Sequence, residues 1–114
     1  MSDCIFCKIA RGDIPCTKVY EDDKVLAFDD IHPMAPVHVV IIPKNHISTL
    51  MDVELEKDGM MNHLIAAAQK VAKIKKIDVK GFRAAINCNA EGGQVVFHLH
   101  VHVLGGRKLQ DELG

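Results

Sequence analysis

The fold is decided by the stretch Gly92-Gly93-Gln94-Val95-Val96-Phe97-His98-Leu99-His100-Val101-His102-Val103-Leu104-Gly105-Gly106. Its apolar and β-branched residues, bounded by two glycine pairs, predict a strand over residues 95–104. Side chains alternate between the two faces of a strand, so one face carries His98, His100 and His102. The other face, which we expect to meet the core, carries Phe97, Leu99, Val101 and Val103. A slip of one residue would bury three imidazoles, so the register is strongly fixed.

Three imidazoles on one face have several possible uses. They could hold a catalytic zinc, but same-face neighbours lie about 6–7 Å apart, and three in a row on a nearly straight strand bind a metal poorly. They could also line a solvent-facing strand. The third possibility is nucleophilic and acid–base chemistry on a phosphate, since neutral imidazole is a nucleophile. Gly92-Gly93 would let backbone N–H groups approach such a phosphate, with Asn87 nearby. The glycine pairs on both sides favour this third interpretation.

The rest of the chain predicts four further strands and two helices. Strands are expected over residues 18–21, 25–29, 37–42 and 82–87, a short helix over residues 4–10, and a long helix from about 53 to 76. The long helix is predicted from one apolar stripe made by Leu55, Met60, Leu64, Ala67, Ala68, Val71 and Ile74. Ser48 and Asp52 are both plausible caps for its start.

This order predicts an α+β fold, with a five-stranded, mostly antiparallel sheet, one long crossover helix and a short N-terminal helix. The 114 residues suit a single domain over 1–114. The helix can cover only one face of the sheet, so we expect a second copy of the chain to complete the burial.

The bulk composition is that of an ordinary globular protein, with 48% hydrophobic and 25% charged residues and a formal net charge of −1. This charge offers no basic field for nucleic acid. No apolar stretch approaches the roughly 20 residues that span a bilayer, and the N-terminus lacks a secretion signal. We therefore expect a cytoplasmic protein with neither membrane nor nucleic-acid partners.

His98-Leu99-His100-Val101-His102-Val103-Leu104 resembles the histidine-triad family, whose signature alternates three histidines with apolar residues. The segments 28–38, 42–47 and 92–107 are similar to its nucleotide-binding phosphoramidase branch. The resemblance covers nearly the whole chain. It implies a homodimer with one continuous sheet, and a hydrolase that cleaves purine nucleoside 5′-phosphoramidates, of the AMP-lysine or AMP-amine type, at the P–N bond.

The resemblance also implies roles for individual residues. His100 would attack the α-phosphorus and become nucleotidylated, His102 would hydrogen-bond the phosphate, and His38 would support them. The substrate-binding residues it implies are Phe28, Asp30, Ile31, Asn87, Gly93, Gln94 and Val95, together with His100 and His102. A carboxylate such as Asp30 suits two ribose hydroxyls because each can donate to it. No cofactor is required for this chemistry.

One position departs from the family pattern. Many members of this branch carry serine after the Gly-Gln pair, with its hydroxyl toward the leaving group, whereas this chain has Val95. The departure leaves the leaving-group preference and the rate open.

Two alternative functions also stay open. One is a dinucleoside polyphosphate hydrolase of the same superfamily, and the other is a nucleotide-binding adaptor with incidental turnover.

Cys4 and Cys7 form a C-x-x-C pair. By spacing alone they could be metal ligands or unconnected thiols, and without a secretion signal disulfides are not favoured. Some members of the resembled family place zinc between such a pair, the histidine corresponding to His46, and the first triad histidine, here His98. The resemblance thus implies a structural zinc site at Cys4, Cys7, His46 and His98, with two sulfur and two nitrogen ligands.

Overall fold

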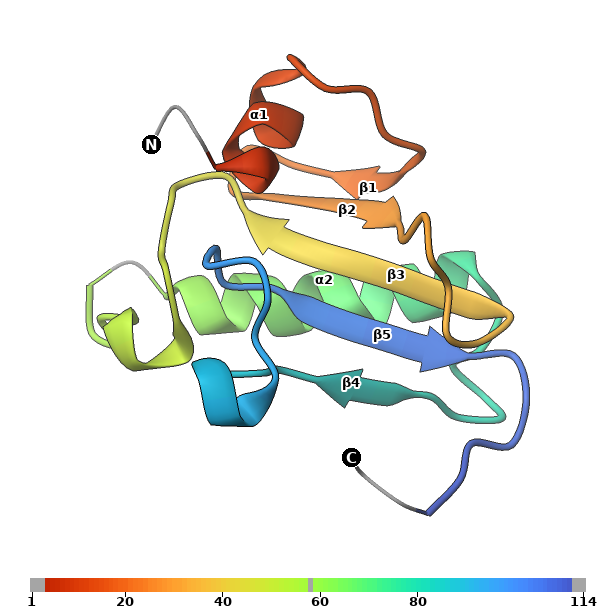
Figure 1. Cartoon of the computed structure of the whole chain (residues 1–114). Helices are drawn as coiled ribbons and strands as arrows, with labels where there is room; N and C mark the ends of the chain where they lie inside the picture. Colours follow the sequence, from red (N-terminus) through yellow and green to blue (C-terminus); the bar gives the residue numbers. More distant parts are fainter. Residues whose placement is uncertain (1–3, 58, 112–114) are drawn as a thin grey trace.

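The computed structural model describes residues 4–57 and 59–111. Its sheet confirms the predicted α+β class, with five antiparallel strands in the order β1-β2-β3-β5-β4 (Figure 1). The strands are β1 (Lys18–Glu21), β2 (Val25–Asp29), β3 (Val37–Pro43), β4 (Arg83–Ala85) and β5 (Val101–Gly105). The α-helices are α1 (Ile5–Arg11) and α2 (Met60–Ile74), and two 3₁₀ turns, η1 and η2, cover Leu50–Asp52 and Ala90–Gly92.

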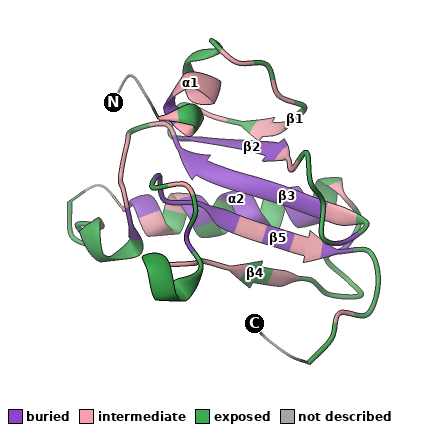
Figure 2. Cartoon of the chain, in the orientation of Figure 1, coloured by how far each residue is buried: buried purple, intermediate pink, exposed green. Residues whose placement is uncertain are grey.

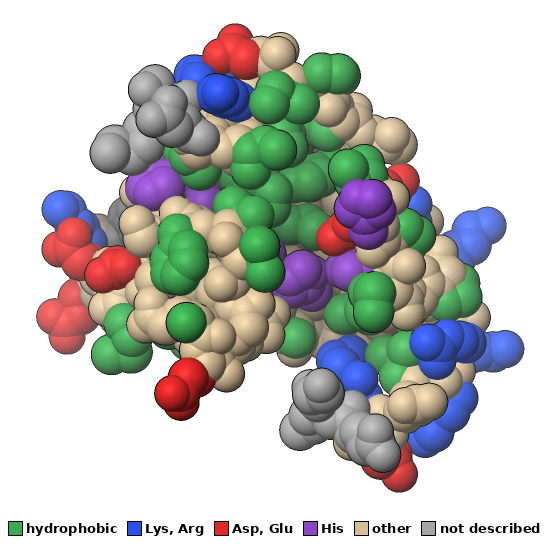
Figure 3. Space-filling view, in the orientation of Figure 1, with side chains coloured by type: hydrophobic (Ala, Val, Ile, Leu, Met, Phe, Trp, Pro, Cys, Tyr) green, Lys and Arg blue, Asp and Glu red, His purple; other side chains and the backbone are tan. Residues whose placement is uncertain are grey.

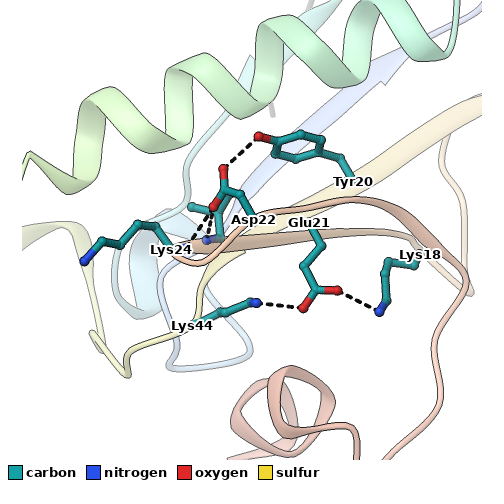
Figure 4. Close-up of polar contacts among 7 residues, drawn as sticks. Lys18, Tyr20, Glu21, Asp22, Lys24 and Lys44 are labelled. Carbon is teal, nitrogen blue, oxygen red and sulfur yellow. Dashed lines mark hydrogen bonds and ion pairs between the residues drawn. The ribbon is translucent and has the colours of Figure 1, made fainter.

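A tight hairpin joins β1 to β2 between the two strands predicted at 18–21 and 25–29. The Asp22 carboxylate accepts the backbone N–H groups of Lys24 and Val25, at 2.8 and 2.9 Å, and the hydroxyl of Tyr20 at 2.7 Å (Figure 4). Lys70 of α2 donates to the same Tyr20 hydroxyl at 3.0 Å. One aspartate therefore closes the turn, and the tyrosine links this edge of the sheet to the long helix.

Both faces of the sheet bury apolar side chains, and the central strands β2 and β3 are the most buried (Figure 2). One face packs against α2 through residues including Val39, Ile41, Leu64, Val71, Leu99, Val101 and Val103. The other face packs against α1, and its buried members are Leu26, Phe28, Val40 and Ile42. The histidine face of β5 is therefore the α1 side of the sheet.

The prediction for the long helix was wrong at its start. Helix α2 begins at Met60 rather than near residue 53, and Leu55, expected in the apolar stripe, is exposed. Gly59 precedes the helix with a positive φ of 67°, a left-handed conformation in which the helix cannot continue. Thr49, rather than Ser48, caps the separate turn η1 through a capping box with Asp52.

The last strand is also shorter than predicted, and so is β4. Strand pairing of β5 begins at Val101, and Phe97, predicted to face the core, is 46% exposed. The preceding residues are held instead by a hydrogen bond from the Leu99 N–H to the Ile47 carbonyl, at 2.6 Å. The alternation of faces still holds from His98 onward, because Leu99, Val101 and Val103 are buried against α2.

At Gly105, the backbone of β5 packs closely against Ile77 in the segment after α2. A Cβ at this position would lie 2.9 Å from the Ile77 Cδ1, so the backbone approaches closely only because glycine stands here. Within the described residues, no helix combines the length and apolar character that a membrane span requires. The cytoplasmic location stays a prediction.

Candidate functional site

His100 lies immediately before β5 and is buried, with only 7% of its surface exposed. Its Nδ1 lies 2.7 Å from the carbonyl oxygen of His98. A carbonyl can only accept, so Nδ1 carries the proton and donates it. In neutral His100 this leaves the lone pair on Nε2, which is the form an attacking imidazole needs.

His102 and His38 form a chain of hydrogen bonds that starts at the backbone. The Met34 N–H donates to Nδ1 of His38 at 3.0 Å, so neutral His38 carries its proton on Nε2. That Nε2 lies 2.9 Å from Nδ1 of His102 and 3.5 Å from a carboxylate oxygen of Asp30. His38 therefore donates to His102 and sets its tautomer. The proton of neutral His102 is on Nε2, on the side away from His38 and free to donate to an anion.

Burial keeps this pair of histidines neutral at physiological pH. Burial lowers the pKa of His38, and the nearby Asp30 carboxylate partly opposes this lowering. Burial also lowers the pKa of His102 to about 4, with His100 and His38 contributing in the same direction. The neutral tautomers derived from the hydrogen bonds are thus the forms present near pH 7.

The predicted nucleoside-binding residues lie at the end of β2 and the loop that follows it. Phe28 is buried, whereas Ile31 is 86% exposed and Asp30 is partly exposed beside His38. One oxygen of Asp30 accepts the His32 N–H at 2.8 Å, which fixes the carboxylate at the edge of the histidine cluster. Figure 3 shows the histidines on one face, below an apolar area formed by hydrophobic side chains.

Sequence reasoning missed Phe6. Its ring centroid lies 5.1 Å from that of His100 and 5.7 Å from that of Phe28, both in edge-to-face geometry. Phe6 thus joins the predicted base-binding residue to the predicted nucleophile. It sits between Cys4 and Cys7, so the one signal that could have placed it here was the C-x-x-C pair itself.

The loop before the triad is built around polar side chains. Asn87 donates to the Gly92 carbonyl at 2.7 Å. The Gln94 amide donates to the carbonyls of Ser48 and Val96 and accepts the Asn89 N–H, so its polar atoms are already engaged within the chain. Gly93 lies beside Asn87 with a φ of 82°, and Val95 is 88% exposed. Substrate contact by these residues stays a prediction.

The four predicted metal ligands come together. The ligand atoms of Cys4, Cys7, His46 and His98 all lie within 4.8 Å of one another. Nδ1 of His98 lies 3.3 and 3.5 Å from the two sulfurs, and Nδ1 of His46 lies 3.2 Å from the sulfur of Cys7. Two sulfurs and two nitrogens in this arrangement are a donor set that tetrahedral zinc accepts.

The orientation of both histidine rings also suits a metal. Nε2 of His98 donates to the Pro43 carbonyl at 2.8 Å, and Nε2 of His46 lies 3.2 Å from the Ser48 hydroxyl. The bond to the carbonyl leaves the Nδ1 lone pair of His98 directed at the sulfurs, as metal ligation requires. The Ser48 hydroxyl can accept from Nε2 of His46, which would leave Nδ1 of His46 in the same form. Burial raises the pKa of the Cys7 thiol and lowers the pKa of His98. A second group, Asp30, His38 and His102, is equally close, but hydrogen bonding between its members already accounts for that proximity.

Comparison with known proteins agrees with this geometry. A family model described as the HIT domain matches residues 11–109. The chain belongs to the HIT (histidine-triad) domain family. The sequence-based recognition of a histidine-triad hydrolase is thereby confirmed at the level of the family.

HIT relatives match over almost their full length. The purine nucleoside phosphoramidase of Escherichia coli K12 is 47% identical over 105 residues, 92% of this chain and 88% of that protein. A histidine triad protein from Clostridium difficile has 49% identity, a TM-score of 0.95, and coverage of 99% and 98% of the two chains. A HIT family hydrolase from Legionella pneumophila has 45% identity, a TM-score of 0.94, and coverage of 98% and 100%.

Proposed function

We propose that this chain hydrolyses purine nucleoside 5′-phosphoramidates, with Nε2 of His100 as the nucleophile. The observation that carries the proposal is the 2.7 Å hydrogen bond from His100 Nδ1 to the His98 carbonyl, which leaves a lone pair on Nε2. The E. coli relative named as a purine nucleoside phosphoramidase supports the substrate class. A binding module has no need of a nucleophile prepared in this way.

In the first step, the Nε2 lone pair forms a bond to the α-phosphorus and the bond from phosphorus to the amine breaks. The leaving amine takes its proton from solvent, because neutral His102 would become an imidazolate if it gave up its Nε2 proton. In the second step, water attacks the phosphorus and releases a proton to solvent, the bond to His100 breaks with its electron pair returning to Nε2, and the nucleoside monophosphate leaves. Splitting one displacement in two suits imidazole, which is both a nucleophile and a fair leaving group.

The surrounding residues bind the substrate and stabilise charge. Asp30 accepts the ribose hydroxyls, and Phe28, Ile31 and Phe6 contact the base. The Nε2–H of His102 hydrogen-bonds the phosphate oxygens, and its tautomer is set by His38. The loop that holds Asn87, Gly93, Gln94 and Val95 lies on the leaving-group side.

The Cys4, Cys7, His46 and His98 cluster is proposed to hold a structural zinc ion. When bound, the ion supplies no reaction chemistry but ties α1 to the sheet beside the triad. We also propose that residues 1–114 form one domain, and that two copies associate through the edge strand β4. Ala84 of β4 pairs with Val103 on the α2 side of the sheet and is nevertheless exposed, so α2 leaves this strand uncovered.

The proposal is tested with adenosine 5′-phosphoramidate. We expect AMP release by the wild type, and a loss on the order of a thousandfold or more in His100→Ala. Base-stable label on the wild-type chain, after a rapid quench with substrate labelled at the α-phosphate, identifies the nucleotidylated intermediate. The His32→Ala chain serves as the control, since that side chain is exposed.

Two other outcomes would assign a different function. If the wild type binds AMP but releases none from any phosphoramidate, the chain is a nucleotide-binding adaptor. If it cleaves dinucleoside polyphosphates far faster than phosphoramidates, the leaving group is a nucleotide rather than an amine.

A further inference from the structure

Five of the chain's 14 Lys and Arg residues line a single hollow. It has a volume of about 700 Å³ and lies beyond the C-terminal end of α2, where β3 begins and β5 ends. Its lining residues are Val37, Lys75, Lys76, Ile77, Lys80, Gly81, Gly106, Arg107 and Lys108. None is acidic, although the whole chain carries a net charge of −1. Figure 3 shows basic side chains gathered at this end of the molecule.

Most of this positive charge is not neutralised by the fold. Lys75 pairs with the Asp29 carboxylate at 3.0 Å. Among the described residues, Arg107 donates to the carbonyls of Lys108 and Met34, at 3.1 and 3.4 Å, and carbonyls carry no charge. Over residues 4–57 and 59–111, no carboxylate pairs with Lys76, Lys80 or Lys108. Favourable placement near a helix C-terminus explains the lysines after α2, but not the basic residues that converge from the segment after β5.

Lys76 occupies a position where glycine is the ordinary residue. Its φ is +61°, and the N–H groups around it close the end of α2 by donating to the carbonyls of Val71, Ala72 and Lys73. This left-handed geometry disfavours every residue with a side chain apart from Asn and Asp. The chain therefore keeps a cation at the hollow against the local preference of the backbone.

We infer that the hollow binds an oligophosphate group, a run of linked phosphates. Cations converging from separate segments match a ligand with several adjacent negative charges. The volume falls in the range of small-ligand pockets and exceeds what a single phosphate would fill. A concave site of this size, on a chain whose formal net charge is −1, favours a small ligand over an extended nucleic acid. The site is separate from the triad, and the inference does not rest on the proposed reaction.

Inorganic tripolyphosphate is the probe, titrated calorimetrically at about 0.15 M salt to screen diffuse attraction. We expect one site per chain, and about tenfold weaker binding in the double variant Lys76→Gln, Lys80→Gln, since each charge-assisted contact contributes a factor of several. The control is Lys24→Gln, Lys73→Gln, which removes the same charge outside the hollow and should bind like the wild type. Both variants should retain hydrolysis of adenosine 5′-phosphoramidate.

Lys76→Gly separates binding from structure. Glycine relieves the positive φ, so we expect Tm to rise by about 2–4 °C while tripolyphosphate binding weakens. A purely structural lysine would show only the first change.

ATP, added with the triad site saturated by AMP, distinguishes the sources of the ligand. Binding equal to that of tripolyphosphate assigns a free oligophosphate, and tighter binding assigns a nucleoside triphosphate. The inference is overturned if millimolar tripolyphosphate does not bind the wild type, or if the control pair weakens binding equally. Single-stranded RNA that binds more tightly than tripolyphosphate, through the same lysines, would also overturn it in favour of nucleic acid.

Discussion

His38 acts on the reaction through the proton of another residue. Removing it in His38→Ala leaves Nδ1 of His102 without its donor, so His102 can hold its proton on the wrong nitrogen. We expect kcat to fall on the order of tenfold to a hundredfold, with little change in KM. Steady-state kinetics measures kcat and KM separately, and the ¹⁵N chemical shifts of His102 report its tautomer. His32→Ala should change neither, and an unchanged His102 tautomer in His38→Ala would refute this role.

Val95 stands where many histidine-triad proteins place a serine hydroxyl. Because the side chain is 88% exposed, Val95→Ser should leave stability unchanged. A hydroxyl facing the leaving amine adds one neutral hydrogen bond, so kcat/KM for phosphoramidates should rise about three- to tenfold. The check is to measure kcat/KM of the wild type and of Val95→Ser for phosphoramidates whose leaving amines differ in basicity. Equal rates for both chains across that series would mean that this position does not meet the leaving group.

At the scale of the element, α1 lines the site through Phe6, and Cys4 and Cys7 on either side of Phe6 belong to the proposed metal cluster. Cys4 and Cys7 flank Phe6, and both contact the His98 ring. If the proposed metal is bound, Cys7→Ser should lose it and loosen α1, which should raise KM about three- to tenfold through the lost aromatic contact and leave kcat nearly unchanged. Elemental analysis and hydrogen exchange over α1 accompany the kinetics.

Cys16→Ser is the matched control for the thiol, since Cys16 packs on the same face of the sheet but lies outside the metal cluster. A Cys7→Ser chain that keeps both its metal and its KM would show that α1 docks independently of the thiols.

Some helices and strands could be predicted from the sequence, and others could not. Period-two alternation placed His98, His100 and His102 on one face, because burial of the intervening residues leaves no other register. The same pattern failed at Phe97, since β5 begins only at Val101 and the chain before it is held instead by the bond from the Leu99 N–H to the Ile47 carbonyl, a contact across 52 residues of sequence. The start of α2 failed for a local reason, the positive φ of Gly59.

The residues of the candidate site also differ in how far the sequence predicts them. The four candidate metal ligands and the triad histidines were predictable, because their residue types and spacings are typical of metal binding and of nucleophilic chemistry. Phe6 and the Met34 N–H were not, because an ordinary phenylalanine and a backbone amide carry no signal until folding brings them to His100 and His38. Position in three dimensions, rather than residue type, gives them their roles.

At the scale of the whole molecule, the uncovered edge strand predicts self-association. Ala84 lies on the α2 side of β4 and is exposed, and Phe82, just before the strand, is 37% exposed. Light scattering should give twice the mass of one chain, and Ala84→Arg should give a monomer because it places a charge in the buried seam. Thr17→Arg, an exposed position before the opposite edge strand, should stay dimeric. A monomeric wild type would remove the proposed dimer.

Buried neutral histidines make the stability of the whole molecule depend on pH. The pKa of His102 is lowered to about 4 by burial, whereas in the unfolded chain it returns to about 6.5. Between these values the unfolded chain binds more protons than the native one, so the free energy of unfolding rises with pH. The contribution is fully present above about pH 6.5 and is lost as pH falls toward 4. The pKa of His38 is lowered too and acts in the same direction.

Urea unfolding between pH 7.5 and 4.5 measures this dependence. Carboxylates that lose their charge near pH 4.5 also make the free energy of unfolding depend on pH. The contribution of His102 is therefore found by comparison with a variant. His102→Gln keeps a polar side chain but cannot titrate, and its free energy of unfolding should vary less with pH than that of the wild type. His32→Ala, with an exposed histidine removed, should follow the wild type. Equal slopes for His102→Gln and the wild type would mean that His102 is protonated as readily in the fold as in water. Burial would then not be what keeps His102 neutral near pH 7.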